Sequence, residues 1–320
     1  MNIFAPINSD ADARDLVDVG ADELYAGVIP TEWKGEYASV KPPNRRANEH
    51  SQVGSLEELE RIARLCEEAG VELYITLNAH FYSQRQTTLI ADLLEKLGEW
   101  DGITGYIIAD VHLIDALEDE IGDKEVLVST GATVFNGMSA SFLADVGADG
   151  IHLPRHLTID EIGQIRETAP DELDLYAFLL NRNCMCIDGN CTLLHNPPIE
   201  HENAERIPCF QEFSTRRAAD GGESVTARLF ANTHRDTEQA CGVCSMFRFR
   251  EMGLSGVKMV GRGLPLEEKV VQVRFLDRVR GLLDETESET EFVERAQSLV
   301  EGAGMTCSLD ACYYPTVMGQ

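Results

Sequence analysis

Lysine is scarce in this sequence: it accounts for only six of the 27 basic residues, and arginine supplies the other 21. Acidic residues number 55, so the formal net charge is −28, and the isoelectric point lies near pH 4.5. A surface that is acidic and poor in lysine suits a protein dissolved at high salt, where repulsion between its charges is screened. We therefore expect a halophilic source. The charge by itself disfavours a partner held through its phosphate backbone.

Long apolar runs and a basic leader are also missing. No stretch approaches the roughly 18 consecutive apolar residues that a membrane-spanning helix needs. The opening segment MNIFAPINSDADARD has no basic start and carries charge from Asp10 onward, unlike a secretory signal peptide. We predict a cytoplasmic protein without a membrane span.

Several catalytic signatures are absent. A peptidase needs a nucleophile with its base, or a metal-bound water, but the sequence contains neither H-E-x-x-H nor G-x-S-x-G. A triad assembled in space from distant residues remains open. The G-x-G at Gly261–Gly263 lacks the third glycine and the well-placed acidic residue of a dinucleotide-binding loop.

What the sequence does contain is one strand-and-helix unit, repeated. Short β-branched and aromatic runs alternate with amphipathic segments, which favours parallel strands joined by right-handed crossovers. Eight such units predict a TIM-like (β/α)8 barrel, with a doubly wound open sheet as the alternative. We expect one domain over residues 1–320, with a cysteine-rich insertion at 181–245 and a C-terminal extension at 285–320. The predicted strands begin near Asn2, Ala21, Val71, Gly102, Glu125, Ala148, Leu173 and Gly256.

Helix caps mark the repeats. Ser9 opens the first helix, and capping boxes are predicted at Ser55 and at Thr158 with Glu161. Two long connections interrupt the pattern: the expected loop Glu32–Gly54 after the second strand and the cysteine-bearing segment after the seventh. Both follow the carboxyl ends of strands, where barrels keep their chemistry.

Polar side chains at the predicted strand ends are candidate site residues, although each could instead cap a helix. Arg262 is favoured, because Gly261-Arg262-Gly263 ends the eighth strand and opens a helix. Backbone N–H groups, the helix dipole and a guanidinium predict an anion site there, for a carboxylate or a phosphate. The other candidates are Asn78, Asp110, Thr130, His152 and Arg155.

Six of the nine cysteines lie between residues 184 and 244. The spacing C-x6-C-x17-C-x31-C-x2-C runs through Cys184, Cys191, Cys209, Cys241 and Cys244, and Cys186 adds a further thiol. Their polar neighbours argue against simple core packing, which suits Cys66 instead. The odd count and the cysteine-poor first half argue against a disulfide framework. Thiolates at such positions predict an iron–sulfur cluster, with zinc as the alternative.

Four features together resemble peptidase family U32, over about residues 2–315: Thr76–Asn78, the C-x6-C pair, the block from Cys241 to Arg262, and the ending Cys312–Pro315. The resemblance implies a TIM-like barrel and a four-iron, four-sulfur cluster held by four cysteines. By position these would be Cys184, Cys191, Cys209 and Cys241, with Cys244 as the rival fourth ligand. The roles of Cys186, Cys307 and Cys312 stay open.

The resemblance also implies the function. Well-understood members carry out oxygen-independent hydroxylation of ubiquinone precursors or RNA bases, and the older peptidase name rests on collagenase-like activity. We therefore expect a redox enzyme that hydroxylates a small aromatic or quinone-like substrate, or an RNA base; no catalytic residue is assigned. We favour a small anionic or aromatic substrate over nucleic acid, although Arg45, Arg46, Arg216 and Arg217 could form a basic rim. The alternatives are a peptidase and a non-catalytic subunit that pairs with a second family member.

Overall fold

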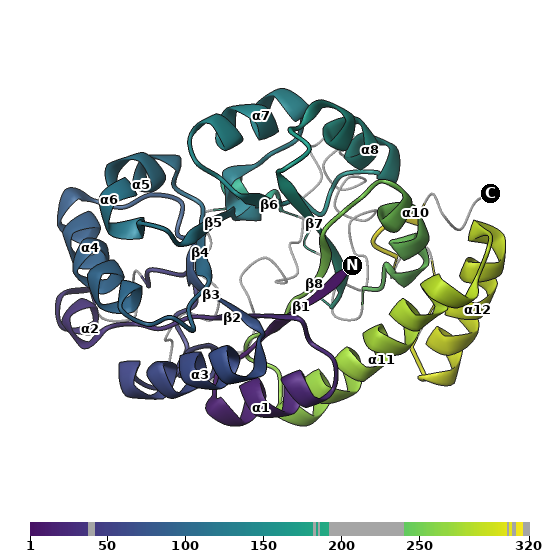
Figure 1. The fold of residues 1–320 in the computed structure, drawn as a ribbon, viewed down its shortest axis with the longest axis horizontal. Helices are drawn as coiled ribbons and strands as arrows, with labels where there is room; N and C mark the ends of the chain where they lie inside the picture. The colour runs from purple at the N-terminus through teal and green to yellow at the C-terminus, as the bar shows by residue number, and fades with distance from the viewer. Residues whose placement is uncertain are drawn as a thin grey trace, which may run out of the picture.

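A computed structural model describes residues 1–37, 42–181, 184, 186–191, 240–305, 307–308 and 312–315. Within them, eight parallel strands form a closed barrel in sequence order, and helices surround the ring (Figure 1). The strand β8 closes the barrel against β1, where Phe4 pairs with Lys258. The TIM-like barrel is thereby confirmed, and the open-sheet alternative is wrong.

The strands are short and almost entirely buried, as expected for a barrel covered on its outer face by helices. They are β1 (Asn2–Pro6), β2 (Glu23–Ala26), β3 (Glu72–Leu77), β4 (Gly105–Ile108), β5 (Glu125–Val128), β6 (Gly150–His152), β7 (Asp174–Leu180) and β8 (Gly256–Met259).

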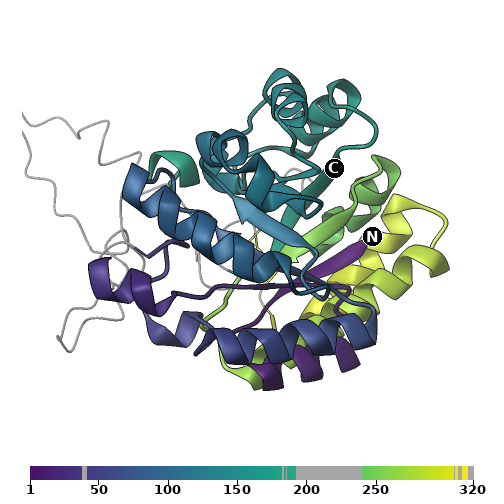
Figure 2. The ribbon, with the colours of Figure 1, turned by 60° about the vertical axis from the view of Figure 1, so that its left-hand side comes forward.

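The helices cover the outside of the ring, and Figure 2 shows α1 and α3 side by side along one flank. They are α1 (Asp10–Asp18), α2 (Thr31–Tyr37), α3 (Leu56–Ala69), α4 (Gln84–Gly98), α5 (Val111–Ala116), α6 (Glu118–Ile121), α7 (Gly137–Asp145), α8 (Ile159–Thr168), α10 (Met246–Glu251), α11 (Leu266–Glu285) and α12 (Glu289–Gly302). Short 3-10 turns are η1 (Glu49–Ser51), η2 (Thr130–Ala132), η3 (Asp188–Asn190) and η5 (Val243–Ser245).

Helix caps explain several boundaries. The Ser9 side chain accepts from the Asp12 N–H, and Thr158 with Glu161 forms the full predicted capping box. The box predicted at Ser55 is only half formed. Ser55 accepts from the Glu58 N–H, but the Glu58 carboxylate accepts from the N–H of Gly54, at 3.1 Å, and so does not reach back to Ser55.

The connection Glu32–Gly54 is not a plain loop, because it begins within α2. Trp33 lies on this helix and is buried, with its ring 5.3 Å from that of Tyr37 and 6.3 Å from that of Tyr82. Burial of one large aromatic side chain stabilises a short helix that its own length would not. The expectation of a loop was wrong because a single tryptophan gives no periodic signal.

Two layers of apolar side chains form the core. One fills the barrel itself, and the larger one lies between the strands and the surrounding helices. Polar groups border the inner layer, because its aromatic rings lie close to charged side chains at both ends of the barrel. Its members are Phe4, Tyr25, Tyr74, Ile107, Leu127 and Tyr176.

The C-terminal region packs beside the last strands. The Phe292 ring of α12 lies 5.9 Å from the Phe247 ring of α10. Cys312 forms a parallel β-bridge with Cys241, and Cys241 forms an antiparallel one with Leu180 at the end of β7. These bridges hold residues 312–315 against the carboxyl end of the barrel. None of the described helices is long and apolar enough to cross a membrane.

Candidate functional site

Arg262 lies just after β8, at the carboxyl end of the barrel, and only 6% of it is exposed. Its guanidinium donates to the Thr76 hydroxyl at 2.8 Å and to the Asn44 carbonyl at 3.0 Å. No carboxylate of the described residues lies within salt-bridge distance of it. Burial lowers the pKa of Arg262 to about 10, so the guanidinium remains charged at neutral pH.

This geometry changes the picture of the predicted anion site. The side chain of Arg262 turns into the barrel: a Cβ on Gly27 of the loop after β2 would lie 1.9 Å from its Nη1. Gly261 has φ +125°, a conformation that favours glycine. The first turn of α11 carries Glu267 and Glu268, which disfavour an anion at that helix N-terminus. Anion binding by Arg262, Gly261 and Gly263 stays a prediction. Because the Arg262 guanidinium faces the interior of the barrel, we expect the anion there rather than at the N-terminus of α11.

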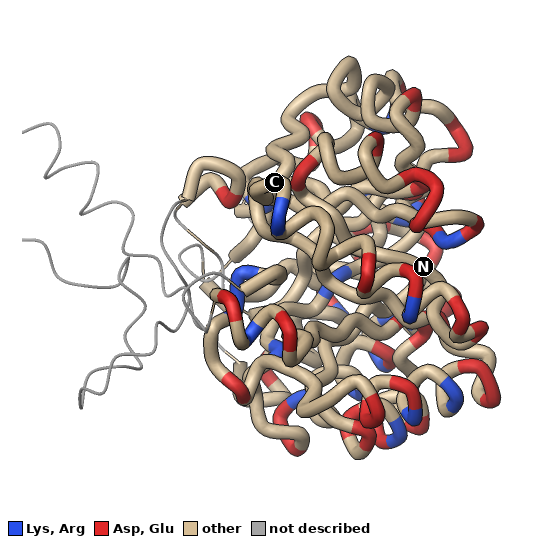
Figure 3. The backbone as a smooth tube through the Cα atoms, turned by 90° about the vertical axis from the view of Figure 1, so that its left-hand side faces the viewer, with Lys and Arg blue, Asp and Glu red and all other residues tan. Residues whose placement is uncertain are grey.

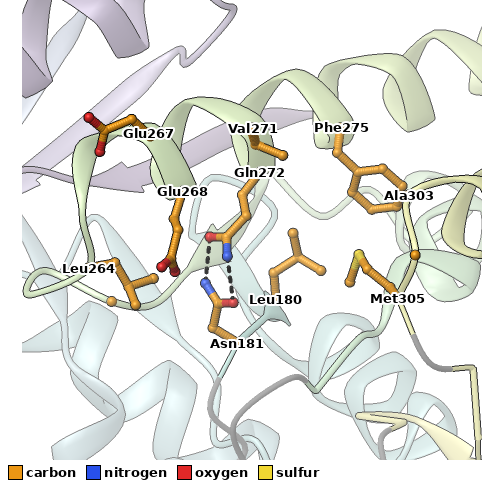
Figure 4. A pocket seen from close by; sticks show the side chains of 12 residues that line it. Leu180, Asn181, Leu264, Glu267, Glu268, Val271, Gln272, Phe275, Ala303 and Met305 are labelled. Carbon is orange, nitrogen blue, oxygen red and sulfur yellow. Dashed lines mark hydrogen bonds between the residues drawn. The ribbon is translucent and has the colours of Figure 1, made fainter.

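A groove of about 620 Å³ runs beside Gly261, on the outer side of this connection. Figure 4 shows its apolar wall and the paired amides of Asn181 and Gln272, which exchange hydrogen bonds of 2.7 and 2.9 Å. Arg262 does not line it. The groove and the interior of the barrel are therefore separate environments. The other residues that line the groove are Leu180, Leu264, Glu267, Glu268, Val271, Phe275, Ala303, Gly304 and Met305.

A second buried basic side chain, that of Lys258, lies inside the barrel. The Lys258 Nζ is 2.9 Å from His152 Nε2 and sits over the rings of Phe4 and Tyr25, at 4.6 and 4.2 Å from their centroids. Burial, and then the nearby Arg262 charge, lower the pKa of Lys258 well below its usual value. Burial and the Lys258 charge do the same to His152.

A third basic side chain, that of Arg155, is paired. Its Nε lies 3.0 Å from the Asp188 carboxylate, and its guanidinium sits 4.3 Å over the Phe178 ring. Burial by itself would raise the pKa of Asp188, but Arg155 and then Arg45 hold it below its usual value. Arg45 donates to the backbone carbonyls of Asp188 and Cys191, at 3.1 and 3.2 Å. These contacts fix the segment 186–191 to the barrel mouth.

The described cysteines divide between two places. Cys184 and Cys191 flank this segment, and the Cys186 N–H donates to the Cys184 Sγ at 3.4 Å. Cys241 and Cys244 lie near Cys307 and Cys312; burial, helped by the neighbouring thiols, raises the pKa of both Cys241 and Cys244 to about 12.

Cys209 lies outside the described residues, so the predicted four-ligand set is incomplete in the structure and stays a prediction. Among the part of the chain that is described, no three His, Cys, Asp or Glu side chains are placed to hold a metal ion. Cys66 is fully buried on α3, as predicted for a core residue. Cys241 forms β-bridges with Leu180, at the end of β7, and with Cys312.

Two of the remaining strand-end candidates, Asp110 and Thr130, have structural partners. Asp110 caps α5 by accepting from the His112 N–H at 3.1 Å, and it also accepts from the Tyr82 N–H. The Thr130 hydroxyl donates to Asp188 at 3.4 Å. Asn78 Oδ1 is buried without a hydrogen-bond partner among the described residues. Asp110 is therefore a helix cap, and Thr130 supports the Arg155–Asp188 pair.

Sequence reasoning missed Lys258 and Asp188. A lysine within a four-residue strand of otherwise apolar residues was the available signal for Lys258, since lysine is almost never fully buried without a reason. Asp188 gave no signal, because its partner Arg155 is 33 positions away.

Charge is distributed unevenly over the molecule. Figure 3 shows acidic positions across most helices, with basic ones interspersed. Against this background, Arg45, Arg155 and Arg262 are concentrated at the carboxyl ends of the strands, and Asp188 is the carboxylate that pairs with Arg155. The carboxyl end of the barrel, which we call the mouth, is thus locally basic, although the protein as a whole is acidic.

Comparisons with known proteins agree with this architecture. The model of peptidase family U32 matches residues 10–307. The chain is 23% identical over 267 residues to the 23S rRNA 5-hydroxycytidine C2501 synthase of Escherichia coli, which covers 82% of this chain and 36% of that protein. It is 23% identical to tRNA hydroxylation protein P1 of Bacillus subtilis, over 81% of this chain and 58% of that one.

A third relative carries a different name. The chain is 27% identical over 221 residues to a collagenase of Porphyromonas gingivalis, covering 65% of this chain and 48% of that protein. This chain thus spans between 36% and 58% of the length of these three relatives.

Proposed function

This chain belongs to peptidase family U32, and from that premise we propose that it is a hydroxylase acting on an RNA base without molecular oxygen. Two of the relatives described above are named for RNA hydroxylation. They move the preference from a small aromatic substrate, expected from the sequence, to a nucleic acid. The net charge argued against RNA, but charge spread over the outer helices bears little on a site inside the barrel mouth.

The observation that carries the proposal is the cationic mouth. Arg262 has committed two of its N–H groups to Thr76 and Asn44, and Arg155 is held by Asp188. Their charges lie in a partly dry site, where an anionic group gains more from them than it would in water. A nucleotide brings such a group, its phosphate, together with a planar base that stacks well on arginine and aromatic rings.

Enzymes that modify a base take it out of its stack. At the barrel mouth the planar guanidinium of Arg155 lies over the ring of Phe178, an arrangement of the kind that stacks on a base. We propose that these side chains hold the extruded base while Arg262 draws the adjoining phosphate.

The chemistry of the thiols fits the iron–sulfur cluster implied by the family, although one of the four expected ligands, Cys209, lies outside the described residues. Cys184, Cys191, Cys209 and Cys241 would hold it, and a backbone N–H that already donates to Cys184 Sγ is the kind of contact that tunes such centres. When bound, the cluster would supply one-electron redox chemistry. The chain's own contribution is to place Cys184 and Cys191 beside the mouth, through Arg45 and Asp188.

The test compares RNA nucleosides by mass spectrometry from host cells that lack their own U32 proteins, with and without this chain. We expect a pyrimidine nucleoside carrying one added oxygen atom only when the chain is present. Cys184→Ala should abolish both the iron content and the new nucleoside, whereas the matched core variant Cys66→Ala should keep both. An unchanged nucleoside profile from iron-loaded protein would contradict the proposal.

The peptidase alternative rests on the collagenase relative. At the mouth, however, Nε2 of His152 is engaged by Lys258 rather than by a hydroxyl or a thiol, so this histidine is not arranged as the base of a nucleophile. Cleavage of gelatin by iron-free protein, lost through one Ser or Cys substitution, would favour the peptidase. Pairing with a second family member stays a prediction; activity that appears only after such a protein is added would support it.

A further inference from the structure

Lys258 and His152 form a pair that the proposed function does not use. His152 is the last residue of β6, and Lys258 is the last but one of β8. Both therefore stand at the carboxyl ends of strands, the face where barrels bind substrates. They are 1% and 6% exposed, and 2.9 Å separates the Lys258 Nζ from the His152 Nε2.

The surroundings of Nζ favour an uncharged amine. No carboxylate of the described residues lies within salt-bridge distance of it, while Arg262 and Arg155 are near enough for their charges to lower the pKa of Lys258, burial being the larger cause. Glu23 acts in the opposite direction, but burial raises its own pKa to about 7. The rings of Phe4 and Tyr25 would stabilise an ammonium, but by less than the desolvation of an unpaired buried charge costs.

The two ring nitrogens of His152 are arranged for proton transfer. Its Nε2 faces the amine, and its Nδ1 is buried without a hydrogen-bond partner among the described residues. Burial by itself lowers the pKa of His152, so the ring is neutral at neutral pH. One of its nitrogens then carries a proton, while the other accepts one.

Lys269 shows what a merely structural buried lysine looks like in this protein. It is fully buried, but its Nζ forms a 2.7 Å salt bridge with Asp12 and a 3.0 Å hydrogen bond with the Arg262 carbonyl. The same protein thus gives one buried lysine a carboxylate and leaves the other beside a histidine and two aromatic rings. A desolvated amine near other cations is the arrangement that activates lysine as a nucleophile.

We propose that Lys258 is a Schiff-base residue for a small 2-oxo acid, with His152 as its proton shuttle. Nζ adds to the keto carbon, and the carbonyl oxygen leaves as water with the two amine protons, which His152 relays. A C=N bond replaces the C=O bond, and nothing is oxidised or reduced. Arg262 is the cation that receives the carboxylate, since it follows the same strand four positions after Lys258 and its hydrogen-bond partners, Thr76 and Asn44, carry no charge.

The test uses the intact, full-length protein with pyruvate or glyoxylate, followed by borohydride reduction and peptide mapping. Reduction converts the imine to a stable secondary amine on the modified lysine. At neutral pH we expect Lys258 to be modified at least about tenfold faster than the exposed Lys34 and Lys96, because its lowered pKa leaves more of the amine unprotonated. Lys269 is the matched buried control and should stay unmodified.

Two variants sharpen the result. Lys258→Met should remove the adduct in folded protein, and His152→Gln should slow its formation while leaving Lys258 in place. Modification of Lys258 no faster than that of Lys96 would overturn the proposal. Equal trapping of acetone, which has no carboxylate, would overturn the assignment of an acid. The reaction needs neither iron nor RNA, so its outcome is independent of the proposed hydroxylase.

Discussion

At the carboxyl ends of the strands the buried charged groups are mainly the guanidinium groups of Arg155 and Arg262. At the amino ends buried and half-buried carboxyl groups gather, since four strands begin with an acidic residue. These are Glu23, Glu72, Glu125 and Asp174. A hollow of about 550 Å³ beside the same end is lined largely by further carboxylates.

The two ends also differ in how their charges are satisfied. Tyrosine hydroxyls serve the acidic end: Tyr74 donates to Glu125 at 2.7 Å, and Tyr176 donates to Glu23 at 3.1 Å. The cationic end relies on neutral groups, apart from the Arg155–Asp188 pair. At the amino end, the carboxyl groups accept hydrogen bonds from neighbouring side chains. At the carboxyl end, a cation without a counter-charge can pair with an anionic ligand. This difference supports the proposal that the mouth is the functional end.

The largest expected effect comes from removing Asp188, the carboxylate that pairs with Arg155 at the cationic mouth. Asp188→Ala takes this counter-charge from the buried Arg155, and we expect a loss of about 3–5 kcal/mol in the free energy of unfolding, measured by urea denaturation. Asp160→Ala is the control, because its contact with Arg248 is 83% exposed on the Asp160 side; it should cost under about 1 kcal/mol. Equal losses would mean that the mouth is not dry.

Arg262→Met keeps the volume but removes the hydrogen bonds to Thr76 and Asn44. We expect a loss of about 2–3 kcal/mol, since hydrogen bonds to a charged group are worth more than neutral ones. Arg262→Lys should recover less than half, because one ammonium cannot copy the planar fork. Thermal unfolding at several salt concentrations measures both. Unchanged stability would make Arg262 purely a ligand-binding residue.

At the acidic end the expected sign is reversed. Burial raises the pKa of Glu23 from 4.5 to about 7, so the folded state retains a proton that the unfolded chain releases. The cost of charging it develops as the pH rises from about 4.5 to 7, and is complete above that range. Glu23→Gln should therefore stabilise the protein by about 2 kcal/mol at pH 8 and leave it unchanged at pH 4. A pH-independent effect would contradict this.

The smallest effect concerns one hydrogen bond at the same end. Tyr176→Phe removes the hydroxyl that donates to Glu23, and we expect a loss of about 1 kcal/mol at pH 8. Because this donor lowers the pKa of Glu23, the pH-dependent fall in stability should extend to higher pH in the variant. Thermal unfolding from pH 5 to 9 measures the shift. Parallel curves for the variant and the unmodified protein would show that the hydroxyl does not act on Glu23.

Much of the barrel could be predicted because its signals are local. A strand start depends on neighbouring β-branched residues, and a cap such as Thr158 with Glu161 depends on a spacing of three. Where local patterns were ambiguous the prediction failed, as with α2, whose helix depends on burial of Trp33 against rings from distant positions. The full capping box predicted at Ser55 was also wrong, because the Glu58 carboxylate accepts from the N–H of Gly54 instead of that of Ser55.

The sequence by itself determined the repeat, the parallel strands and the grouping of thiols after the seventh strand, because periodicity and spacing are written along the chain. Only the tertiary structure decided which charged groups would meet and what surrounds them. Lys258 and Lys269 are both lysines near the C-terminal end of the chain, yet one is paired with Asp12 and the other faces His152. Closure of the barrel brings together residues more than a hundred positions apart, and burial there sets the charge each one carries.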